Sequence, residues 1–215
     1  FDSIEILLDE MRIAIQEGPQ WQQWDSELGH RILKSKLSRS LPQIRHLLLF
    51  DAEGNQRHTS FAESPPVINV RDRPYFQQIR DGADRARFGP YVGRNSNRPT
   101  YAIARRMGRE HFEGALMVAI EPQYFEDFCR ASRPFSEFET AIVNAEGTIV
   151  AICRSLQGPI TQLPATAGSD YRVAMADGEI GSATLTMNRS LLETPRFVVS
   201  TEPVPGYPDL RIVST

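Results

Sequence analysis

The residues best suited to chemistry in this sequence are arginines that lie next to aromatic side chains. The clearest example is the segment Asn69-Val70-Arg71-Asp72-Arg73-Pro74-Tyr75-Phe76, which combines two cations, one anion and two aromatic rings. Guanidinium groups form paired hydrogen bonds with carboxylates and phosphates, and the rings could wall an apolar pocket. The segment therefore predicts a binding site for a small anion, with candidate residues Arg71, Asp72, Arg73, Tyr75 and Phe76.

Further candidates for the same pocket are Tyr91, Arg94 and Tyr101, which lie in segments predicted to be strands. A second interpretation is equally open. The two aromatic residues of the 69–76 segment could simply pack a helix on a sheet, while its charged residues form a salt network on the surface. In that case the segment stabilises the fold and binds nothing.

Arginine is enriched over lysine throughout the chain. The sequence has 22 Arg and only two Lys, and ten of the arginines fall between positions 71 and 109, where there are only three Asp and no Glu. A GC-rich genome that encodes a solvated surface would produce this bias. A positively charged pocket for an anionic ligand would produce it as well, because guanidinium groups suit carboxylates.

Common catalytic and metal-binding motifs are absent from the sequence. It has no phosphate loop ending in Gly-Lys-Ser/Thr, no Gly-x-Ser-x-Gly elbow and no His-Glu-x-x-His. Its four histidines are scattered, and Cys129 and Cys153 have no metal-ligand spacing. These two cysteines could be free buried thiols, a disulfide or, least favoured, a redox pair. We therefore expect no catalytic residue, no metal and no cofactor.

Length and composition describe an ordinary soluble chain. It has 215 residues, 40% of them apolar, and a net charge of −3. This predicts one large or two small domains, argues against nucleic acid as the main partner, and leaves no apolar run long enough for a membrane helix. The chain begins in a helical pattern without Met, so we expect it to be excised from a longer protein.

Residues 1–43 read as a helical region that precedes the first strand. Ile4, Leu7, Leu8, Met11 and Ile15 follow helical spacing, Gly18-Pro19 interrupts them, and Asp25 is a typical N-cap for a second helix. So long a region predicts a stalk that forms a homodimer. Simple packing of these helices on the sheet is the alternative.

The pattern changes to strands after Pro42. A strand from Ile44, a turn at 51–54 and a return strand form a predicted hairpin, followed by a short helix at 73–80. Residues 82–89 read as a polar loop. Three more strands are predicted at 91–94, 100–107 and 113–120, and a helix at 122–132.

The hairpin pattern then repeats. Leu49-Phe50-Asp51-Ala52-Glu53-Gly54 matches Ile142-Val143-Asn144-Ala145-Glu146-Gly147 at an offset of 93 residues. Later strands are predicted at 148–153, 182–188, 196–202 and 210–215. Self-similarity at this period indicates two tandem modules, here 44–132 and 133–215. The predicted fold class is α+β, with a long N-terminal helix followed by two modules with antiparallel sheets.

The order of these motifs resembles that of double Cache sensor domains. Asp72-Arg73-Pro74-Tyr75-Phe76 is similar to the helix entrance of that family, and 89–94, 101–106, 114–120 and 124–125 follow with similar spacing. The resemblance is strongest from Ile44 to Phe128. It implies two PAS-like modules, of which the first, membrane-distal one binds a small molecule and the second is membrane-proximal.

The resemblance also implies where such a domain works. Domains of this family lie outside the cytoplasmic membrane of bacteria, in the periplasm, as the sensor of a membrane-tethered protein. The output is commonly a histidine kinase, a diguanylate cyclase or phosphodiesterase, or a chemoreceptor. The sensor domain itself is not an enzyme. A ligand-free structural spacer of such a receptor and a hydrolytic or redox enzyme are the alternatives.

Amino-acid-binding members of the family use an Arg-x-Trp-aromatic string, a later Tyr and an Asp on a strand. Arg73, Tyr75 and Phe76 occupy the string here, with Tyr in place of Trp, and Tyr101 matches the later Tyr. The strand Asp is replaced by Ala119, with Glu121 two residues on. The resemblance therefore implies a small carboxylate or other anion, held by Arg73 and Arg94, rather than a free α-amino acid.

Overall fold

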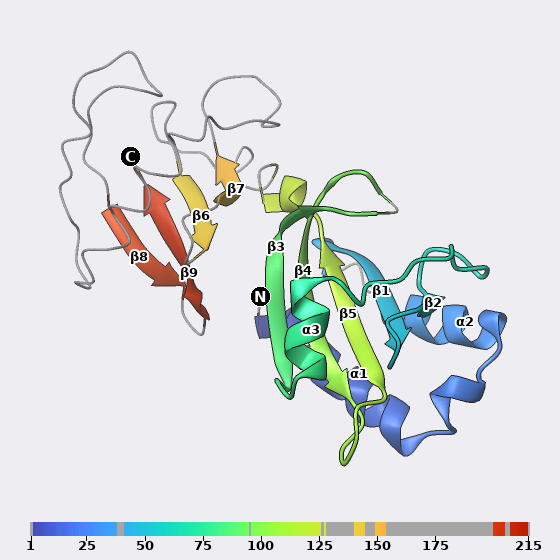
Figure 1. The fold of residues 1–215 in the computed structure, drawn as a ribbon. Coiled ribbons are helices and arrows are strands. Elements are labelled where there is room, and N and C mark those ends of the chain that lie inside the picture. The colour runs from blue at the N-terminus through green and yellow to red at the C-terminus, as the bar shows by residue number, and fades with distance from the viewer. Residues whose placement is uncertain are drawn as a thin grey trace. The chain divides into compact units, whose positions relative to one another are not determined.

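The computed structural model describes residues 2–37, 41–94, 96–125, 127, 140–144, 149–153, 200–204 and 207–214. The chain divides into two compact units, Phe1–Pro122 and Gln123–Thr215 (Figure 1). Each is described by itself. The module boundary predicted at residue 132 lies outside the described residues.

The first unit is built on one antiparallel sheet of five strands in the order β2-β1-β5-β4-β3. The strands are β1 (Ile44–Asp51), β2 (Gln56–Thr59), β3 (Arg85–Val92), β4 (Pro99–Met107) and β5 (Gly114–Ile120). The central strand β5 is buried along its whole length, since it pairs with β1 on one side and β4 on the other. The predicted hairpin and the predicted strands at 100–107 and 113–120 are confirmed.

The prediction of a polar loop at 82–89 is wrong, because β3 begins at Arg85 and pairs with β4 from Arg85↔Arg105 onward. Ala86 and Phe88 of this strand face the main core cluster. Arg85 and Arg87 alternate with them and so face the other side of the sheet. A carboxylate of α1 forms an ion pair with Arg87 there. Charged residues that look solvated in the sequence therefore lie in a strand that is hydrogen-bonded to β4.

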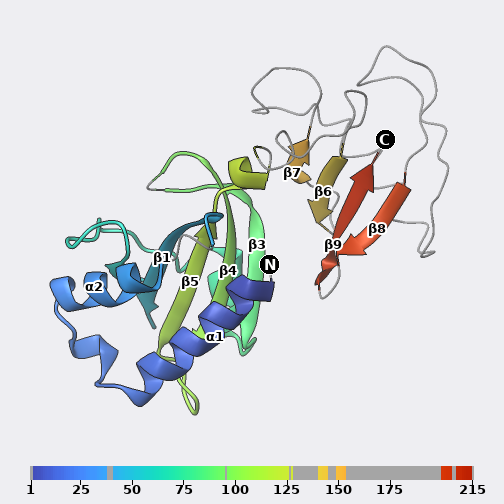
Figure 2. The ribbon, with the colours of Figure 1, turned by 180° about the vertical axis from the view of Figure 1, so that it is seen from behind.

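Two helices cover one face of this sheet. Helix α1 (Asp2–Glu17) lies against β4 and β5, and α2 (Ser26–Lys36) lies against β2 and β1, with the short 3-10 helix η1 (Trp21–Gln23) between them (Figure 2). Asp25 caps α2 as predicted, accepting a hydrogen bond of 2.7 Å from the backbone nitrogen of Leu28. Within the described residues, the region predicted to be a stalk thus packs on the sheet, which was the alternative interpretation. Its role in a dimer stays a prediction.

A third helix, α3 (Pro74–Arg80), covers the opposite face of the sheet. It confirms the short helix predicted at 73–80. It buries Tyr75, Phe76 and Ile79 against residues of β1 and β5 such as Phe50 and Met117. The side chain of Asp72 does not cap this helix. The N-cap is Arg73, which makes no side-chain cap hydrogen bond.

The turn between β1 and β2 forms as the Asp-x-x-Gly pattern predicts. Gly54 has φ +85°, a conformation that side chains with a Cβ rarely adopt. Asp51 Oδ1 accepts hydrogen bonds from the backbone nitrogens of Glu53 and Asn55. These contacts fix the hairpin and the start of β2.

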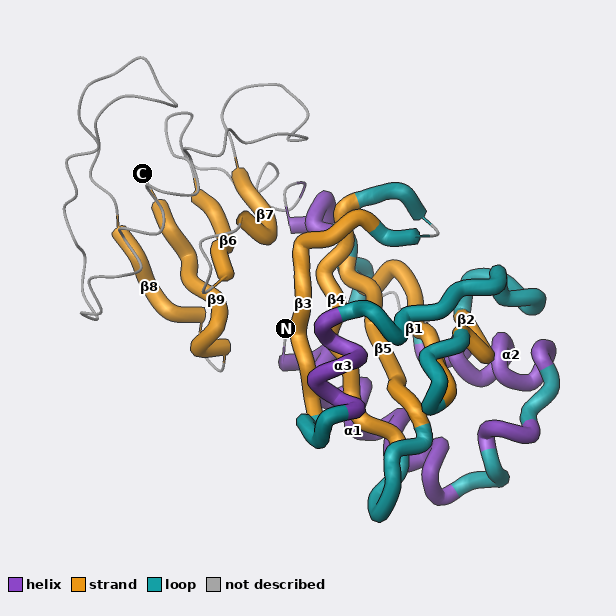
Figure 3. Tube along the Cα trace, in the orientation of Figure 1, coloured by secondary structure: helices purple, strands orange, loops and turns teal. Residues whose placement is uncertain are grey.

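The second unit has four described strands, β6 (Thr140–Asn144), β7 (Ile149–Cys153), β8 (Ser200–Val204) and β9 (Tyr207–Ser214) (Figure 3). Their order, β7-β6-β9-β8, matches β2-β1-β5-β4 of the first sheet. The first hairpin has a register shift next to the pair Phe50↔Gln56, and the second has one next to Val143↔Ile149, 93 residues further on. The predicted structural repeat is confirmed at the level of the sheets.

Some predictions fall on residues that the structure does not describe. They include the strand at 182–188, most of the helix at 122–132 and the state of Cys129. Residues 122–125 are helical. Among the described residues, no helix is both long enough and apolar enough to cross a membrane.

Candidate functional site

A cavity of about 260 Å³ lies in the first unit, on the face of the sheet that carries α3. Half of the ten predicted site residues line it: Arg73, Tyr75, Tyr91, Arg94 and Ala119.

Arg73 is the arginine of this cavity for which no ion pair is found among the described residues. It is the residue before α3, and its guanidinium carbon lies 5.2 Å from the centre of the Tyr91 ring. This distance is typical of a cation–π contact. Among the described residues, no carboxylate forms an ion pair with Arg73. Its fork of N–H donors therefore remains available to an anion.

Tyr75 and Tyr91 form one aromatic wall, with ring centres 6.1 Å apart and Phe88 beside both. Phe88 and Tyr91 share a face although they are three positions apart, because the register of β3 shifts between them. Burial raises the pKa of Tyr75 well above its ordinary value and that of Tyr91 to about 12. Both phenols are therefore neutral hydrogen-bonding groups at neutral pH.

Arg94 lines the same cavity but is already paired. Its Nη2 donates to Asp72 Oδ2 at 2.6 Å, and its Nη1 donates to the backbone oxygen of Asn69. The hydrogen bond from Arg94 lowers the pKa of Asp72 below its ordinary value. Asp72 thus holds Arg94 in place from an exposed position and does not line the cavity itself.

Arg45 and His46 of β1 also line the cavity. Arg45 donates from Nε to His46 Nε2 at 3.2 Å and from Nη1 to Glu121 Oε1 at 3.3 Å. Glu121 accepts a second bond from Arg98 at 3.2 Å. Burial, together with the nearby charge of Arg45, lowers the pKa of His46 to about 4, so the imidazole is neutral at neutral pH.

The other predicted residues are placed elsewhere. Phe76 is buried in the core beside Phe112, and Arg71 is exposed. Tyr101 lies between Thr100 and Ala102, which face the cavity and the core under α3, so its ring points to the opposite face of the sheet. Asp72 and Glu121 act only by pairing with Arg94 and Arg45.

Sequence patterns did not mark five polar residues of this site, which are Arg45, His46, Gln56, Ser96 and Thr100. Gln56 is the most deeply placed side chain among those that lack a partner. It opens β2, its side chain is buried, and it lines the cavity. No sequence motif marks it, and a single Gln two residues after a turn carries little information. The apolar lining could not be predicted either, because strand alternation assigns residues to a face only when the register is known. The apolar lining residues are Leu48, Phe50, Ile68, Val70 and Met117.

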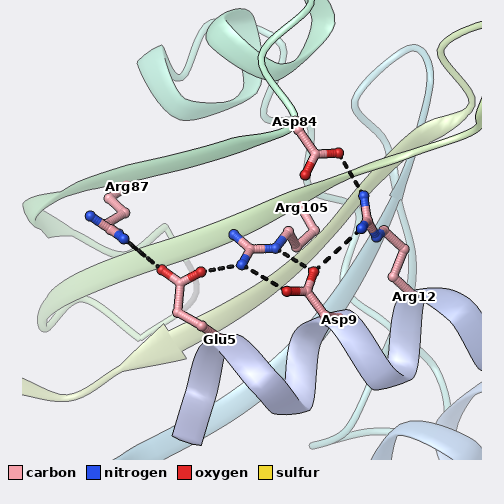
Figure 4. Close-up of polar contacts among 6 residues, drawn as sticks. All are labelled: Glu5, Asp9, Arg12, Asp84, Arg87 and Arg105. Atoms are coloured by element: carbon pink, nitrogen blue, oxygen red, sulfur yellow. Dashed lines mark hydrogen bonds and ion pairs between the residues drawn. The ribbon is translucent and has the colours of Figure 1, made fainter. Parts of the chain in front are cut away.

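Two arginines of β3 and β4 on the opposite face of the sheet, Arg87 and Arg105, are paired with carboxylates of α1 (Figure 4). Glu5 of α1 contacts Arg87 Nη2 at 2.9 Å and also accepts a hydrogen bond from Arg105 Nη2. Asp9 of α1 accepts from Arg105 Nε at 2.7 Å. The Arg105 side chain is only 4% exposed, and that of Glu5 only 11%.

The same cluster extends along α1. Arg12 contacts Asp9 at 3.5 Å and Asp84, at the start of β3, at 2.6 Å. The hydrogen bond from Arg105 lowers the pKa of Asp9 below its ordinary value. Part of the arginine enrichment is therefore structural, because these residues fasten α1 to β3 and β4. We call Glu5, Asp9, Arg12, Asp84, Arg87 and Arg105 the α1 ion-pair cluster.

No metal site is visible in the described part of the chain, where no group of three His, Cys, Asp or Glu side chains could hold an ion. A scan against protein-family models and a search of curated protein sequences both found no match.

Solved structures do match. The extracellular domain assigned to histidine kinase rpHK1S-Z16 is 21% identical with a TM-score of 0.77, and the match covers 100% of this chain and 85% of that one. The sensor domain of the Vibrio cholerae histidine kinase DctB is 16% identical, with a TM-score of 0.58 and coverage of 98% and 85%. The ligand-binding domain of the Pseudomonas fluorescens chemoreceptor CtaA, solved with L-isoleucine, is 15% identical, with a TM-score of 0.65 and coverage of 99% and 82%.

Identities this low establish similarity of fold. The matched strand order of the two sheets and the cover of α1 and α2 agree with that similarity. The chain therefore has the α+β fold of the extracellular sensor domains of bacterial histidine kinases and chemoreceptors, as its resemblance to double Cache domains predicts.

Proposed function

We propose that this chain is the extracytoplasmic sensing region of a membrane-bound bacterial signal transducer. The transducer is a histidine kinase, a diguanylate cyclase or phosphodiesterase, or a chemoreceptor. The shared fold with sensor domains of kinases and chemoreceptors supports this proposal. The sensing region is not catalytic in this proposal and acts by binding a small molecule in the first unit.

The ligand is a small carboxylate or another small anion. The observation that carries this is the unpaired guanidinium of Arg73 in a cavity whose described lining has three arginines and no acidic residue. Arg94 and Arg45 form direct ion pairs with Asp72 and Glu121, whereas Arg73 forms none with a described residue and interacts with Asp72 only at longer range. A carboxylate on Arg73 gains two charge-assisted hydrogen bonds in a partly dry site.

A free amino acid is a poorer fit to this lining. Structures of related fold contain asparagine, L-isoleucine or GABA, all of which carry an ammonium group as well as a carboxylate. An ammonium group needs an anionic or strongly accepting partner when it leaves water. Ala119 stands where amino-acid-binding domains have the Asp that would supply it.

The experiment is a thermal-shift screen of small monocarboxylates, dicarboxylates, amino acids, amines and phosphate. A ligand at 100 times its Kd stabilises the fold by about 2.7 kcal/mol, which is readily measured. For the best carboxylate, Arg73→Ala is expected to raise Kd about tenfold or more. Arg71→Ala removes the same charge two residues away from an exposed position, and is expected to change nothing.

Three outcomes would contradict the proposal. If amines bind and carboxylates do not, Arg73 does not anchor the ligand. If none of the compounds shifts the melting temperature, the chain fits the ligand-free spacer better than the sensor. Equal Kd values for the Arg73→Ala protein and the unmodified protein would place the ligand elsewhere.

The dimer through the N-terminal helix remains part of the proposal. Ile6 and Ile13 of α1 are exposed, at 59% and 46%, on the side of the helix opposite the buried residues Ile4, Leu8, Met11 and Ile15. Ile6 and Ile13 are seven positions apart and so lie on one side of the helix. Sedimentation of the Ile6→Glu/Ile13→Glu variant is expected to give a lighter particle than the unmodified protein.

A further inference from the structure

Gln56 is the one residue of the cavity lining, among those described, that is buried and polar with both polar side-chain atoms unpaired. It is only 8% exposed, and neither Nε2 nor Oε1 has a hydrogen-bond partner in the described protein. A buried primary amide without partners is costly, so such groups are rare unless they have a task. The side chain lines the same cavity as Arg73.

The irregular register of the β1–β2 hairpin places Gln56 on the face of the sheet that lines the cavity. Gln56 pairs with Phe50, which also lines the cavity, whereas His58 pairs with Leu49, and the register shifts between these pairs. His58 packs against α2, where a Cβ on Gly29 would lie 2.1 Å from its Nδ1. Two residues that regular alternation would put on one face therefore lie on opposite faces.

The fold does not require an amide at this point of the hairpin. The second unit has the same register shift, and Ile149 there takes the place of Gln56. An aliphatic residue is thus compatible with the same backbone. The amide of Gln56 has a role that the hairpin alone does not explain.

The remaining described lining defines what the amide could meet. Leu48, Phe50, Ile68, Val70 and Met117 make much of the cavity apolar, and Arg73 supplies the free positive charge. The complement is a molecule with one carboxylate, an apolar body and one neutral group. A primary amide both donates and accepts, so the neutral group that pairs with both of its atoms must do the same. In a cavity of about 260 Å³, a hydroxyl is the smallest group with that property.

Resting on the proposed function, we propose that the cavity selects a small hydroxycarboxylate with an apolar body, and that Gln56 recognises its hydroxyl group. Arg73 then sets the affinity for the charge, and Gln56 sets the choice among carboxylates. A site built to hydrogen-bond a hydroxyl discriminates strongly against an analogue that lacks it, because the amide is then left buried and unpaired. Gln56 is in this sense the specificity-determining residue of the site.

The test compares probes that share one aliphatic body. They are 4-methylpentanoate, 2-hydroxy-4-methylpentanoate, 3-hydroxy-4-methylpentanoate and L-leucine, titrated calorimetrically into the unmodified protein. The better of the two hydroxy acids is expected to bind about tenfold or more tightly than 4-methylpentanoate, a ratio that corresponds to about 1.4 kcal/mol. L-leucine is expected to bind worse than either hydroxy acid, because its ammonium group meets arginines.

The variant Gln56→Leu keeps the size of the side chain and removes the amide. It is expected to abolish or reverse the preference for the hydroxy acid, so that 4-methylpentanoate binds at least as well. Gln77→Leu makes the same chemical change at an exposed position on α3 and is expected to keep the preference. A cooperative unfolding transition of Gln56→Leu without ligand, at or above the melting temperature of the unmodified protein, verifies that it folds.

The outcomes separate this inference from the function on which it rests. If no carboxylate binds the unmodified protein, the proposed function fails and this inference fails with it. If carboxylates bind but the hydroxyl group makes no difference, only the role of Gln56 is overturned. A hydroxyl preference that survives Gln56→Leu also overturns it, since another residue then recognises the hydroxyl group.

Discussion

The two faces of the first sheet use arginine in opposite ways. On the face under α1, Arg87 and Arg105 are buried and bound to Glu5 and Asp9 (Figure 4). On the face under α3, Arg73 lines a cavity and forms no ion pair with a carboxylate of the described residues. A buried arginine in an ion pair holds two elements together, because removing either partner leaves a buried charge without compensation. An unpaired arginine beside a cavity leaves its donors to a ligand. Arginine enrichment alone therefore says little until each residue is assigned to a face.

The largest expected effect is on the paired face. Arg105→Ala is expected to lower the free energy of unfolding by about 3 kcal/mol, the lower end of the range for a broken buried ion pair, because Glu5 keeps Arg87. Chemical denaturation measures it. Arg109→Ala, on the exposed turn after β4, is the control and is expected to cost less than about 0.5 kcal/mol. A loss as small as the control's would mean that the ion pairs of α1 do not hold the helix.

Dense packing under α2 gives the next effect. A Cβ on Gly29 would lie 2.1 Å from the His58 ring, so Gly29→Ala is expected to cost about 1–3 kcal/mol by overpacking. The substitution would otherwise favour the helix by up to about 1 kcal/mol. In a His58→Ala background, the same change is expected to be neutral or stabilising. Urea unfolding of the four proteins decides this, and additive effects would show that the two residues do not touch.

The cavity face holds a half-buried histidine, His46, whose titration affects stability. The pKa of His46 is lowered from 6.5 to about 4 by burial, so the folded protein keeps this histidine neutral. Between pH 6.5 and pH 4 the unfolded chain binds a proton that the folded chain does not, and stability falls as pH falls. His58, with a pKa that burial also lowers, acts in the same direction. Unfolding of His46→Gln is therefore expected to depend less on pH in this range than that of the unmodified protein. Parallel curves would contradict this.

On the paired face, the pKa of Asp9 is lowered below its ordinary value of 3.8. The ionised Asp9 carboxylate therefore makes its full contribution to stability above pH 3.8. That contribution is lost as pH falls through the folded-state pKa. The unmodified protein is therefore expected to be more stable than Asp9→Asn above pH 3.8, and this difference is expected to shrink as pH falls below 3.8. The pH dependence of stability caused by His46 thus falls between pH 6.5 and about 4, and that caused by Asp9 falls below pH 3.8.

The smallest expected effect is the counterpart of the first. Arg73→Ala is expected to lower the free energy of unfolding by about 0.5–1 kcal/mol, because it breaks no ion pair and loses one cation–π contact. Only its cation–π contact with Tyr91 is lost from the fold. Together with Arg105→Ala, this variant measures the contrast between the two faces directly. A loss close to that of Arg105→Ala would make Arg73 a structural residue.

Local patterns predicted much of the first unit. Helical spacing gave α1, Asp25 gave the start of α2, and Gly54 gave the β1–β2 turn. The Arg73-Pro74-Tyr75 string placed α3 and the cation of the cavity. These features depend on residues within a few positions of one another, so the sequence contains the information that decides them.

What depends on distant contacts could not be predicted. The strand character of 85–89 depends on pairing with β4 and on Glu5, which lies 82 positions before Arg87 and 100 before Arg105. Tyr101 was assigned to the cavity because its type fits, but the register of β4 turns it away. Gln56 faces the cavity only because of an irregularity in the β1–β2 register. None of these relations is visible from spacing along the chain.

The α1 ion-pair cluster also constrains how this protein can change over evolutionary time. Replacing Glu5 or Arg105 alone leaves a buried charge uncompensated, whereas replacing both with apolar residues of similar size is often tolerated. Substitutions at positions 5 and 105 are therefore expected to occur together in descendant sequences, so that the two positions covary. Position 73 has no such ion-pair partner among the described residues. Its residue type is therefore expected to vary with the ligand that each lineage binds and not with another position of the chain.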